Sequence, residues 1–288
     1  MADEKSNFNL PLPTLGGLQF WTDRRWRDGF RVQRNAITNH HRLLSPRNIR
    51  LAWGNESQCL SALERHCPRP TPSGRSYVIL AHGLLRASPS MKPLAKAIAR
   101  AEDSPIVRFD YASSRAAMPD HAAALGELLA DLPTDATFRF VCHSMGNIVV
   151  RHLIADLQRR GDPQQLLPRC RSMIMLGPPN QGAEIARRLA PTQVFGWVAG
   201  KSAMQLGVRW NELEPSLATP PFPFHILTGD ITTFRRHPMV SGPNDGIVAV
   251  EEAKLDGAES FELFPVAHGV LIYSKRVIAR VIELLADS

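Results

Sequence analysis

Short apolar runs alternate with longer amphipathic stretches over the last three quarters of the chain. Residues 77–81 are wholly apolar, which is typical of a strand buried on both faces. Further strands are predicted at residues 106–111, 138–142, 173–176, 224–228 and 261–266, and helices at 89–102, 116–132, 146–160, 183–214 and 270–286. Repeated strand–helix units of this length predict an α/β fold, with a mainly parallel central sheet and helices on both faces.

The N-terminal quarter has a different pattern. Two short extended pieces are predicted at residues 30–34 and 49–53, and a helix follows at 56–65. Residues 67–75 then hold three prolines and a glycine, which exclude a helix or a central strand. We therefore expect residues 1–75 to form an extension packed on a main domain of residues 76–288.

The net charge of +7 is concentrated in this N-terminal quarter. Residues 1–75 hold 12 Lys and Arg against 6 Asp and Glu, whereas the rest of the chain is nearly balanced. A basic patch of this kind would attract an anionic membrane surface or an acidic partner. The alternative is a solvated arginine-rich surface whose side-chain stems pack on the main domain. Only the charge favours nucleic acid, so no nucleic-acid partner is expected.

The composition is that of a soluble globular protein, with 44% apolar and 21% charged residues in a chain of 288. No segment approaches the roughly 20 apolar residues of a membrane span, and prolines and glycines interrupt the apolar stretch at residues 8–20. We therefore expect a cytoplasmic protein with reduced cysteines. The spacing of Cys59, His66 and Cys67 matches no zinc pattern, so no metal is expected.

The strongest chemical signal lies where the strand at residues 138–142 meets the following helix. Ser144 occupies the turn, at the carboxyl end of a buried strand, where its hydroxyl is exposed. Gly146 follows two positions later, and a residue without a side chain lets the helix pack close to the strand. The N–H of Met145, at the helix N-terminus, would face an oxyanion formed at Ser144.

This segment, Cys-His-Ser-Met-Gly, resembles the nucleophile elbow Gly-x-Ser-x-Gly of the α/β-hydrolase fold. Cys142 replaces the first glycine, and cysteine is a small residue. The resemblance implies that Ser144 is the nucleophile. It also implies that His82-Gly83-Leu84, after the first strand of the sheet, opens the oxyanion loop, with the N–H of Leu84 as the second donor beside Met145.

Two further residues would complete a catalytic triad. Asp245 lies in Asn-Asp-Gly-Ile-Val after a late strand, where the family has its acid, and Asp230, nearer the strand end, is the competing candidate. His268 directly follows the last strand, so its imidazole can reach Ser144 along the carboxyl edge of the sheet. The order serine, aspartate, histidine is that of the fold. Four weaker candidates for the base remain: His82, His143, His225 and His237.

A fifth segment narrows the family. Residues 175–183 resemble the Leu-Gly-Thr-Pro-His-x-Gly segment of bacterial triacylglycerol lipases, with Pro178 and Asn180 in place of Thr and His. Such enzymes carry a lid where residues 183–214 lie here, and these form either a lipid-facing lid or a cap packed on the domain. The apolar side of the segment comprises Ile185, Leu189, Val194, Phe195, Trp197, Val198 and Leu206.

The resemblance covers residues 76–288 and implies a lipase- or esterase-like serine hydrolase. Such an enzyme cleaves acyl esters of small molecules or lipids through an acyl-enzyme, without a metal or an organic cofactor. Thioesters stay open as substrates. A different class is a non-catalytic binding or membrane-surface protein on a hydrolase scaffold, although all three triad positions are filled.

Overall fold

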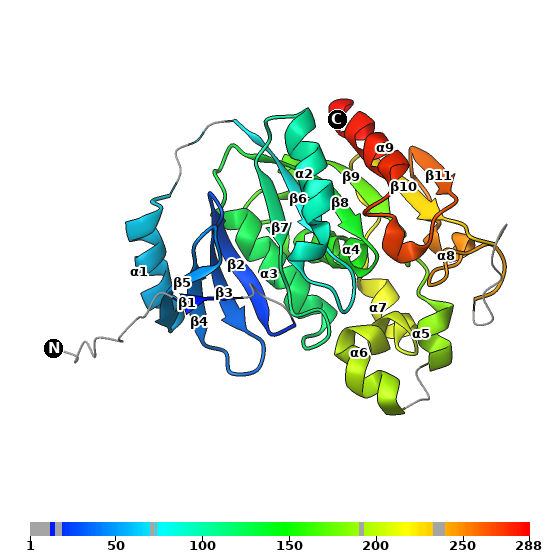
Figure 1. The fold of residues 1–288 in the computed structure, drawn as a ribbon, viewed down its shortest axis with the longest axis horizontal. Coiled ribbons are helices and arrows are strands. Elements are labelled where there is room, and N and C mark those ends of the chain that lie inside the picture. Colours follow the sequence, from blue (N-terminus) through cyan, green and yellow to red (C-terminus); the bar gives the residue numbers. More distant parts are fainter. Residues whose placement is uncertain (1–11, 15–18, 70–71, 73, 190–192, 233–239) are drawn as a thin grey trace.

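Six parallel strands form the central sheet in a computed structural model that describes residues 12–14, 19–69, 72, 74–189, 193–232 and 240–288 (Figure 1). The strands are ordered β11-β10-β9-β8-β6-β7 across the sheet. They are β6 (Ser76–Ala81), β7 (Ile106–Phe109), β8 (Thr137–His143), β9 (Cys170–Leu176), β10 (Phe224–Gly229) and β11 (Ser260–Phe264). All six predicted strands are found, and the prediction of a mainly parallel sheet is confirmed.

Helices cover both faces of this sheet, as predicted. The apolar sides of α3 (Met118–Asp131) and α4 (Met145–Arg160) pack on one face, and those of α2 (Lys92–Ala101) and α9 (Lys275–Ala286) pack on the other. Single 3₁₀ turns lie at Ser88–Met91, Leu167–Arg169, Glu214–Ser216 and His268–Val270. Within the described ranges, no helix combines the length and the apolar character needed to cross a bilayer.

The prediction of one helix over residues 89–102 was wrong in one respect. The structure has a 3₁₀ turn at Ser88–Met91 and begins α2 only at Lys92. A continuous α-helix would require the N–H of Pro93 to donate to the carbonyl of Pro89, and proline has no N–H.

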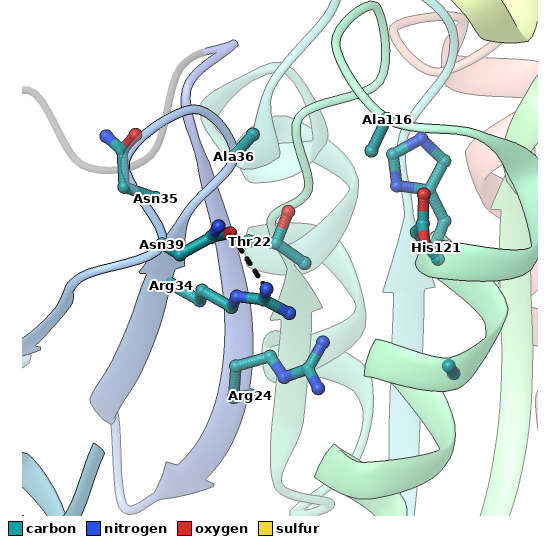
Figure 2. Close-up of a pocket in the computed structure, with 10 residues that line it drawn as sticks. Thr22, Arg24, Arg34, Asn35, Ala36, Asn39, Ala116 and His121 are labelled. Carbon is teal, nitrogen blue, oxygen red and sulfur yellow. Dashed lines mark hydrogen bonds between the residues drawn. The ribbon is translucent and has the colours of Figure 1, made fainter. Parts of the chain in front are cut away.

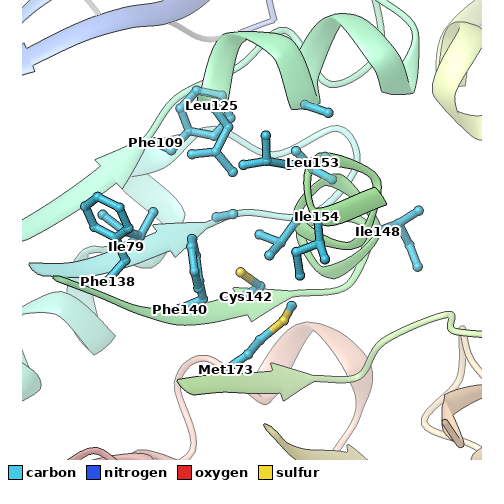
Figure 3. Close-up of a cluster of buried hydrophobic side chains, with 14 of the residues drawn as sticks. Ile79, Phe109, Leu125, Phe138, Phe140, Cys142, Ile148, Leu153, Ile154 and Met173 are labelled. Atoms are coloured by element: carbon cyan, nitrogen blue, oxygen red, sulfur yellow. The ribbon is translucent and has the colours of Figure 1, made fainter. Parts of the chain in front are cut away.

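The wholly apolar character of the central strands follows from this layering. In β8 the side chains of Phe138, Phe140 and Cys142 join the cluster under α3 and α4 (Figure 3), whereas Val141 joins the cluster under α2 and α9. Successive side chains of a strand point to opposite faces, and here both faces are covered. Cys142, at the position of the first elbow glycine, is therefore a fully buried core residue.

The N-terminal residues form a second, antiparallel sheet with the order β1-β5-β4-β3-β2. Its strands are β1 (Leu12–Pro13), β2 (Trp21–Arg27), β3 (Phe30–Asn35), β4 (His41–Leu44) and β5 (Ile49–Gly54), and α1 (Glu56–His66) follows. Buried side chains between this sheet and α1 make a small separate core: Val32, Leu43, Ala52, Cys59, Ala62 and Leu63. The sequence predicted β3, β5 and α1 but not β1, β2 and β4. Arginines and an aspartate interrupt β2, β4 begins with His41 and Arg42, and β1 has only two residues.

Strand β2 lies against α3 (Figure 1). Arginines of β2 and β3 pair with acids on α3, on β2 itself and in the segment after β7. Arg27 donates to both carboxylate oxygens of Asp131 on α3, each at 3.2 Å, and both side chains are buried. Arg24 and Arg25 pair with Glu127, also on α3, and Arg31 pairs with Asp23 and Asp110. Much of the N-terminal positive charge is thus paired with carboxylates where the two sheets meet.

The cap consists of α5 (Glu184–Leu189), α6 (Gln193–Leu206) and α7 (Trp210–Leu213). The end of α6 is held on the main domain, because Ser202 donates to the carbonyl of Ala116 at 2.9 Å and Gln205 accepts from the N–H of Met118 at 2.9 Å. Of the predicted apolar side, Ile185 is half-buried and Leu206 is buried, and both face the domain. The side chains at 189, 194, 195, 197 and 198 lie outside the described ones.

The turn from β8 into α4 is crowded by the neighbouring strand. A Cβ atom on Gly146 would lie 2.7 Å from the carbonyl oxygen of Ala81 and 2.9 Å from that of His82. Both oxygens belong to backbone that is fixed in the sheet edge. Glycine at this position is therefore a packing requirement of the strand–helix turn, as the sequence predicted.

We expect Gly146→Ala to lower the free energy of unfolding by about 1–3 kcal/mol, because backbone must move to admit the methyl group. Gly126→Ala in α3 is the matched control, since its Cβ would meet only the end of the Leu153 side chain, at 3.0 Å. The control should be neutral or slightly stabilising, given the higher helix propensity of alanine. Urea unfolding followed by circular dichroism measures both, and equal midpoints would contradict the crowding at the turn.

Candidate active site

Ser144 occupies the strand–helix turn with φ of 54° and ψ of −125°. A positive φ is uncommon for a residue with a side chain and marks a constrained backbone. The turn is held by the N–H of Ser144, which donates to the carbonyl of Leu176 on β9 at 2.8 Å. As a result the partly exposed Ser144 side chain lines a cavity of about 390 Å³ at the carboxyl edge of the sheet.

His268 and Asp245 form a buried hydrogen-bonded pair beside this cavity. His268 Nδ1 lies 2.7 Å from Asp245 Oδ2, and the exposed fraction of Asp245 is only 1%. The other oxygen, Oδ1, accepts from the N–H groups of Ile247 at 3.0 Å and Val248 at 2.8 Å. Since a carboxylate only accepts hydrogen bonds, Nδ1 carries the proton of neutral His268 and Nε2 is left as the basic nitrogen.

The backbone reinforces this pair, since the N–H of His268 donates to the carbonyl of Asp245 at 2.9 Å. His268 lines the same cavity as Ser144. Over the described residues no hydrogen bond joins Ser144 Oγ to the imidazole. Such bonds are often long in free enzymes and tighten when substrate is bound.

The predicted oxyanion loop lies directly against Ser144. A Cβ atom on Gly83 would lie 3.1 Å from Ser144 Cβ, so only glycine leaves the backbone room to approach. The loop then turns back, with the N–H of Arg86 donating to the carbonyl of Gly83 at 3.2 Å and Leu85 at a φ of 57°. In the described part of the chain the N–H groups of Leu84 and Met145 have no protein acceptor, and Met145 is the first residue of α4.

The other candidate bases have structural surroundings. His143 is buried, and its Nε2 donates to the carbonyl of His268 at 3.0 Å while the two rings lie 4.8 Å apart. Burial holds the pKa of His143 well below its ordinary value, so this side chain is neutral and braces the His268 loop. His82 stacks on Tyr111 and His225 contacts Ser260, both away from the cavity. His237 lies outside the described residues.

The competing acid, Asp230, does not approach the imidazole. Its Oδ1 accepts from the N–H of Thr232 at 2.9 Å and from its hydroxyl at 2.6 Å. These contacts are those of an Asx turn, a local use of aspartate. In this structure the pair with His268 is made by Asp245.

The cavity walls are largely apolar. Its lining comes from the oxyanion loop, the cap and the Asp245 loop, and includes Leu84, Leu85, Pro179, Ala183, Ile185, Ala186, Ala203, Leu206, Ile247 and Val248. Asn180 does not face it: its side-chain amide donates to the carbonyl of Ala253 at 2.9 Å, and its oxygens accept from buried Arg151 on α4. Asn180 therefore holds residues 175–183 in place through contacts outside the cavity. The cavity itself offers mainly hydrophobic contact to a substrate.

Gln19, in the turn just before β2, reaches the predicted oxyanion loop. The amide nitrogen of Gln19 donates to the carbonyl of Arg86 at 2.6 Å, and its oxygen accepts from the backbone and hydroxyl of Ser114 and from Ser113. One side chain from outside the main domain thus ties together two loops at the edge of the sheet. The sequence gives no sign of this role, because Gln19 lies 67 residues from Arg86 along the chain.

A second link is a buried acid pair. The N–H of Asp110 donates to the carboxylate of Asp23, and the N–H of Asp23 donates to the carbonyl of Asp110, each at 2.8 Å. Burial raises the pKa of Asp23 to about 6, against the nearby charge of Arg31. Asp110 also lies 3.6 Å from Nε2 of His82, which immediately precedes Gly83 of the predicted oxyanion loop. Burial acts to raise the pKa of Asp110, but the contacts with His82 outweigh this effect and the pKa is lowered.

A separate cleft of about 250 Å³ lies between the N-terminal sheet and α3 (Figure 2). Thr22, Arg24, Arg34 and His121 line it, and Arg34 donates to Asn39 at 2.8 Å. Burial lowers the pKa of His121 to about 3, so its ring is neutral. The cleft contains none of the predicted catalytic residues. In the described part of the chain, no cluster of three or more His, Cys, Asp or Glu suits a metal ion, and Cys59 is a core residue.

No protein-family model matches the chain, and no curated protein matches it in sequence. Solved structures do match. The mature lipase BlEst2 from Bacillus licheniformis has a TM-score of 0.57 and 18% identity, over 74% of this chain and 93% of that one. Phospholipase PlaB from Legionella pneumophila has a TM-score of 0.55 and 17% identity, over 74% and 60%. The lin2722 product of Listeria innocua has 0.51 and 16%, over 73% and 94%. The chain thus has the α/β-hydrolase fold, which it shares with the bacterial lipase BlEst2 and phospholipase PlaB.

Proposed function

We propose that the protein is a serine hydrolase that cleaves carboxylic esters through an acyl-enzyme. The observation that carries this proposal is a cavity lined by Ser144, His268 and Leu84, with Asp245 bonded to His268. The backbone N–H groups of Leu84 and of Met145, which follows Ser144, have no acceptor among the described residues. A nucleophile, a base held by an acid, and donors for an oxyanion are the parts that acyl transfer requires. The likeness to lipases and esterases supports the same class at the level of the fold.

In the proposed reaction, His268 Nε2 takes the proton of Ser144 Oγ as this oxygen attacks the acyl carbon. The N–H groups of Leu84 and Met145 donate to the oxyanion, and Asp245 stabilises the imidazolium. The bond to the alcohol oxygen then breaks, and His268 protonates the leaving oxygen. Water attacks the acyl-enzyme with His268 as base, the bond to Ser144 breaks and its proton is restored, which releases the acid.

The same residues would also hydrolyse thioesters, in which only the leaving atom differs. The apolar cavity favours an acyl ester with a hydrocarbon portion, from a small molecule or a lipid. A non-catalytic protein on this scaffold is the rival proposal, and turnover decides between the two. A cytoplasmic location and contact of the N-terminal sheet with an anionic membrane stay predictions.

Ser144→Ala should lose about 10⁶-fold in kcat on p-nitrophenyl esters, because no other group can form the acyl-enzyme. It should also lose labelling by a fluorophosphonate probe. Ser57→Ala, an exposed serine on α1, is the control and should keep both. Persistent labelling of the Ser144 variant, or no turnover by the wild type, would reject the enzyme proposal.

Asp245→Asn should lower kcat by about 10⁴-fold, because an amide in place of the carboxylate favours the wrong imidazole tautomer. Asp230→Asn changes the same functional group in a local turn and should stay within a few-fold of the wild type. Steady-state kinetics with p-nitrophenyl butyrate compares the two variants. A larger loss from Asp230→Asn than from Asp245→Asn would contradict the assignment of Asp245 as the acid of the triad.

A further inference from the structure

Arg86 lies on the predicted oxyanion loop and places a positive charge in a cavity that is otherwise largely apolar. It lines the cavity with Ser144 and His268 among mostly apolar side chains. A Cβ atom on Gly269 would lie 2.7 Å from an Arg86 Nη2 atom, so the guanidinium lies against the residue that follows His268. The cation is therefore next to the base rather than directed away from the site.

No acid among the described residues neutralises this guanidinium. Among the residues that the structure describes, Arg86 has no ion-pair partner, and its side chain donates no hydrogen bond. The acid of the site, Asp245, is occupied by His268 and by two backbone N–H groups. By contrast, Arg24, Arg27 and Arg31 are all paired with carboxylates. A half-buried guanidinium without a partner keeps its hydrogen-bonding capacity for a ligand.

The backbone that carries Arg86 is fixed at both of its polar groups. Its N–H donates to the carbonyl of Gly83, and its carbonyl accepts from Gln19. A guanidinium on such an anchored loop loses less conformational freedom on binding than one on a free loop, which favours recognition of a ligand.

The position beside His268 also indicates which part of the substrate meets the charge. In the proposed reaction His268 protonates the leaving oxygen, so the alcohol portion of the ester lies on the His268 side of the scissile bond. When His268 takes the proton of Ser144, it becomes a second cation beside Arg86, and Asp245 is the acid that contacts it. A negative group on the alcohol would balance the second cation.

We propose that Arg86 binds an anionic group, phosphate or carboxylate, on the alcohol portion of the substrate. This proposal rests on the proposed ester hydrolase function. The acyl chain would occupy the apolar part of the cavity, whose rim carries the exposed side chains of Leu85 and Ile247. The substrate class is thus an acyl ester of a phosphorylated or carboxylated alcohol. The fork of donors on arginine matches the geometry of both anions.

Two matched pairs of esters test the proposal below their micellar concentrations. The phosphate pair is 1-octanoylglycerol 3-phosphate and 1-octanoylglycerol, and the carboxylate pair is O-octanoyl glycolate and O-octanoyl glycolamide. Release of octanoate gives kcat/KM for each ester. The wild type should prefer the charged member of at least one pair, and the favoured pair identifies the anion. Arg86→Gln should lower that ratio by about 10- to 100-fold, whereas Arg86→Lys should retain part of it.

Arg276→Gln, an exposed arginine on α9, is the control and should leave the ratio unchanged. A second measurement uses only the wild type and so does not depend on the folding of a variant. Octyl phosphate should inhibit hydrolysis of 1-octanoylglycerol more strongly than octanol does. No preference for either charged ester, equal inhibition by octyl phosphate and octanol, or an unchanged ratio in a folded Arg86→Gln protein would overturn the inference. If the wild type cleaved none of the four esters and took no fluorophosphonate label, the result would contradict the proposed ester hydrolase itself, not only the role of Arg86.

Discussion

The hydrogen bond between His268 Nδ1 and Asp245 Oδ2 is the interaction on which the rest of the site depends. The carboxylate is buried, one of its oxygens is held by two backbone N–H groups, and only the other is available to the imidazole. That division fixes the proton on Nδ1 and leaves Nε2 free as a base. His143 adds a second restraint, since it holds the carbonyl of His268 from the strand that leads into Ser144. The base is therefore positioned from two sides before any substrate arrives.

The opposite side of the cavity is positioned from outside the hydrolase domain. Gln19 ties the oxyanion loop to the segment after β7, and the Asp23–Asp110 pair joins β2 to the same region next to His82. The N-terminal sheet is also joined to α3 by the buried pair of Arg27 and Asp131. Preorganised donors stabilise a transition state only when their backbone is held in place. The N-terminal sheet thus contributes to the geometry of the site although it supplies none of the proposed catalytic atoms.

The fold could be predicted from the sequence because the central strands are buried on both faces and show as continuous apolar runs. The elbow was predictable from its local sequence, because a glycine two positions after Ser144 is typical of a tight strand–helix turn. In the structure the carbonyl of Ala81 on the neighbouring strand requires that glycine. Strands β2 and β4 were not predicted because neither has an alternating apolar pattern. Ion pairs with α3 hold β2, and the small core under α1 holds β4. Asp245 and Asp230 both follow β10 and precede His268, so the Asn-Asp-Gly-Ile-Val context favoured Asp245 without excluding Asp230, and only the three-dimensional contacts separate them. Gln19 and His143 contact partners distant in sequence, and the position of Arg86 beside Gly269 depends on the fold, so no local pattern reveals these residues.

The most direct test of acyl-enzyme catalysis is to trap the intermediate during turnover. Wild-type protein mixed with a p-nitrophenyl ester and quenched in acid within the first turnover would be digested and analysed by mass spectrometry. The proposed mechanism predicts that the acyl group is attached at Ser144, on the peptide that joins β8 to α4. Steady turnover with no acylated peptide, or with the acyl group on another residue, would contradict it.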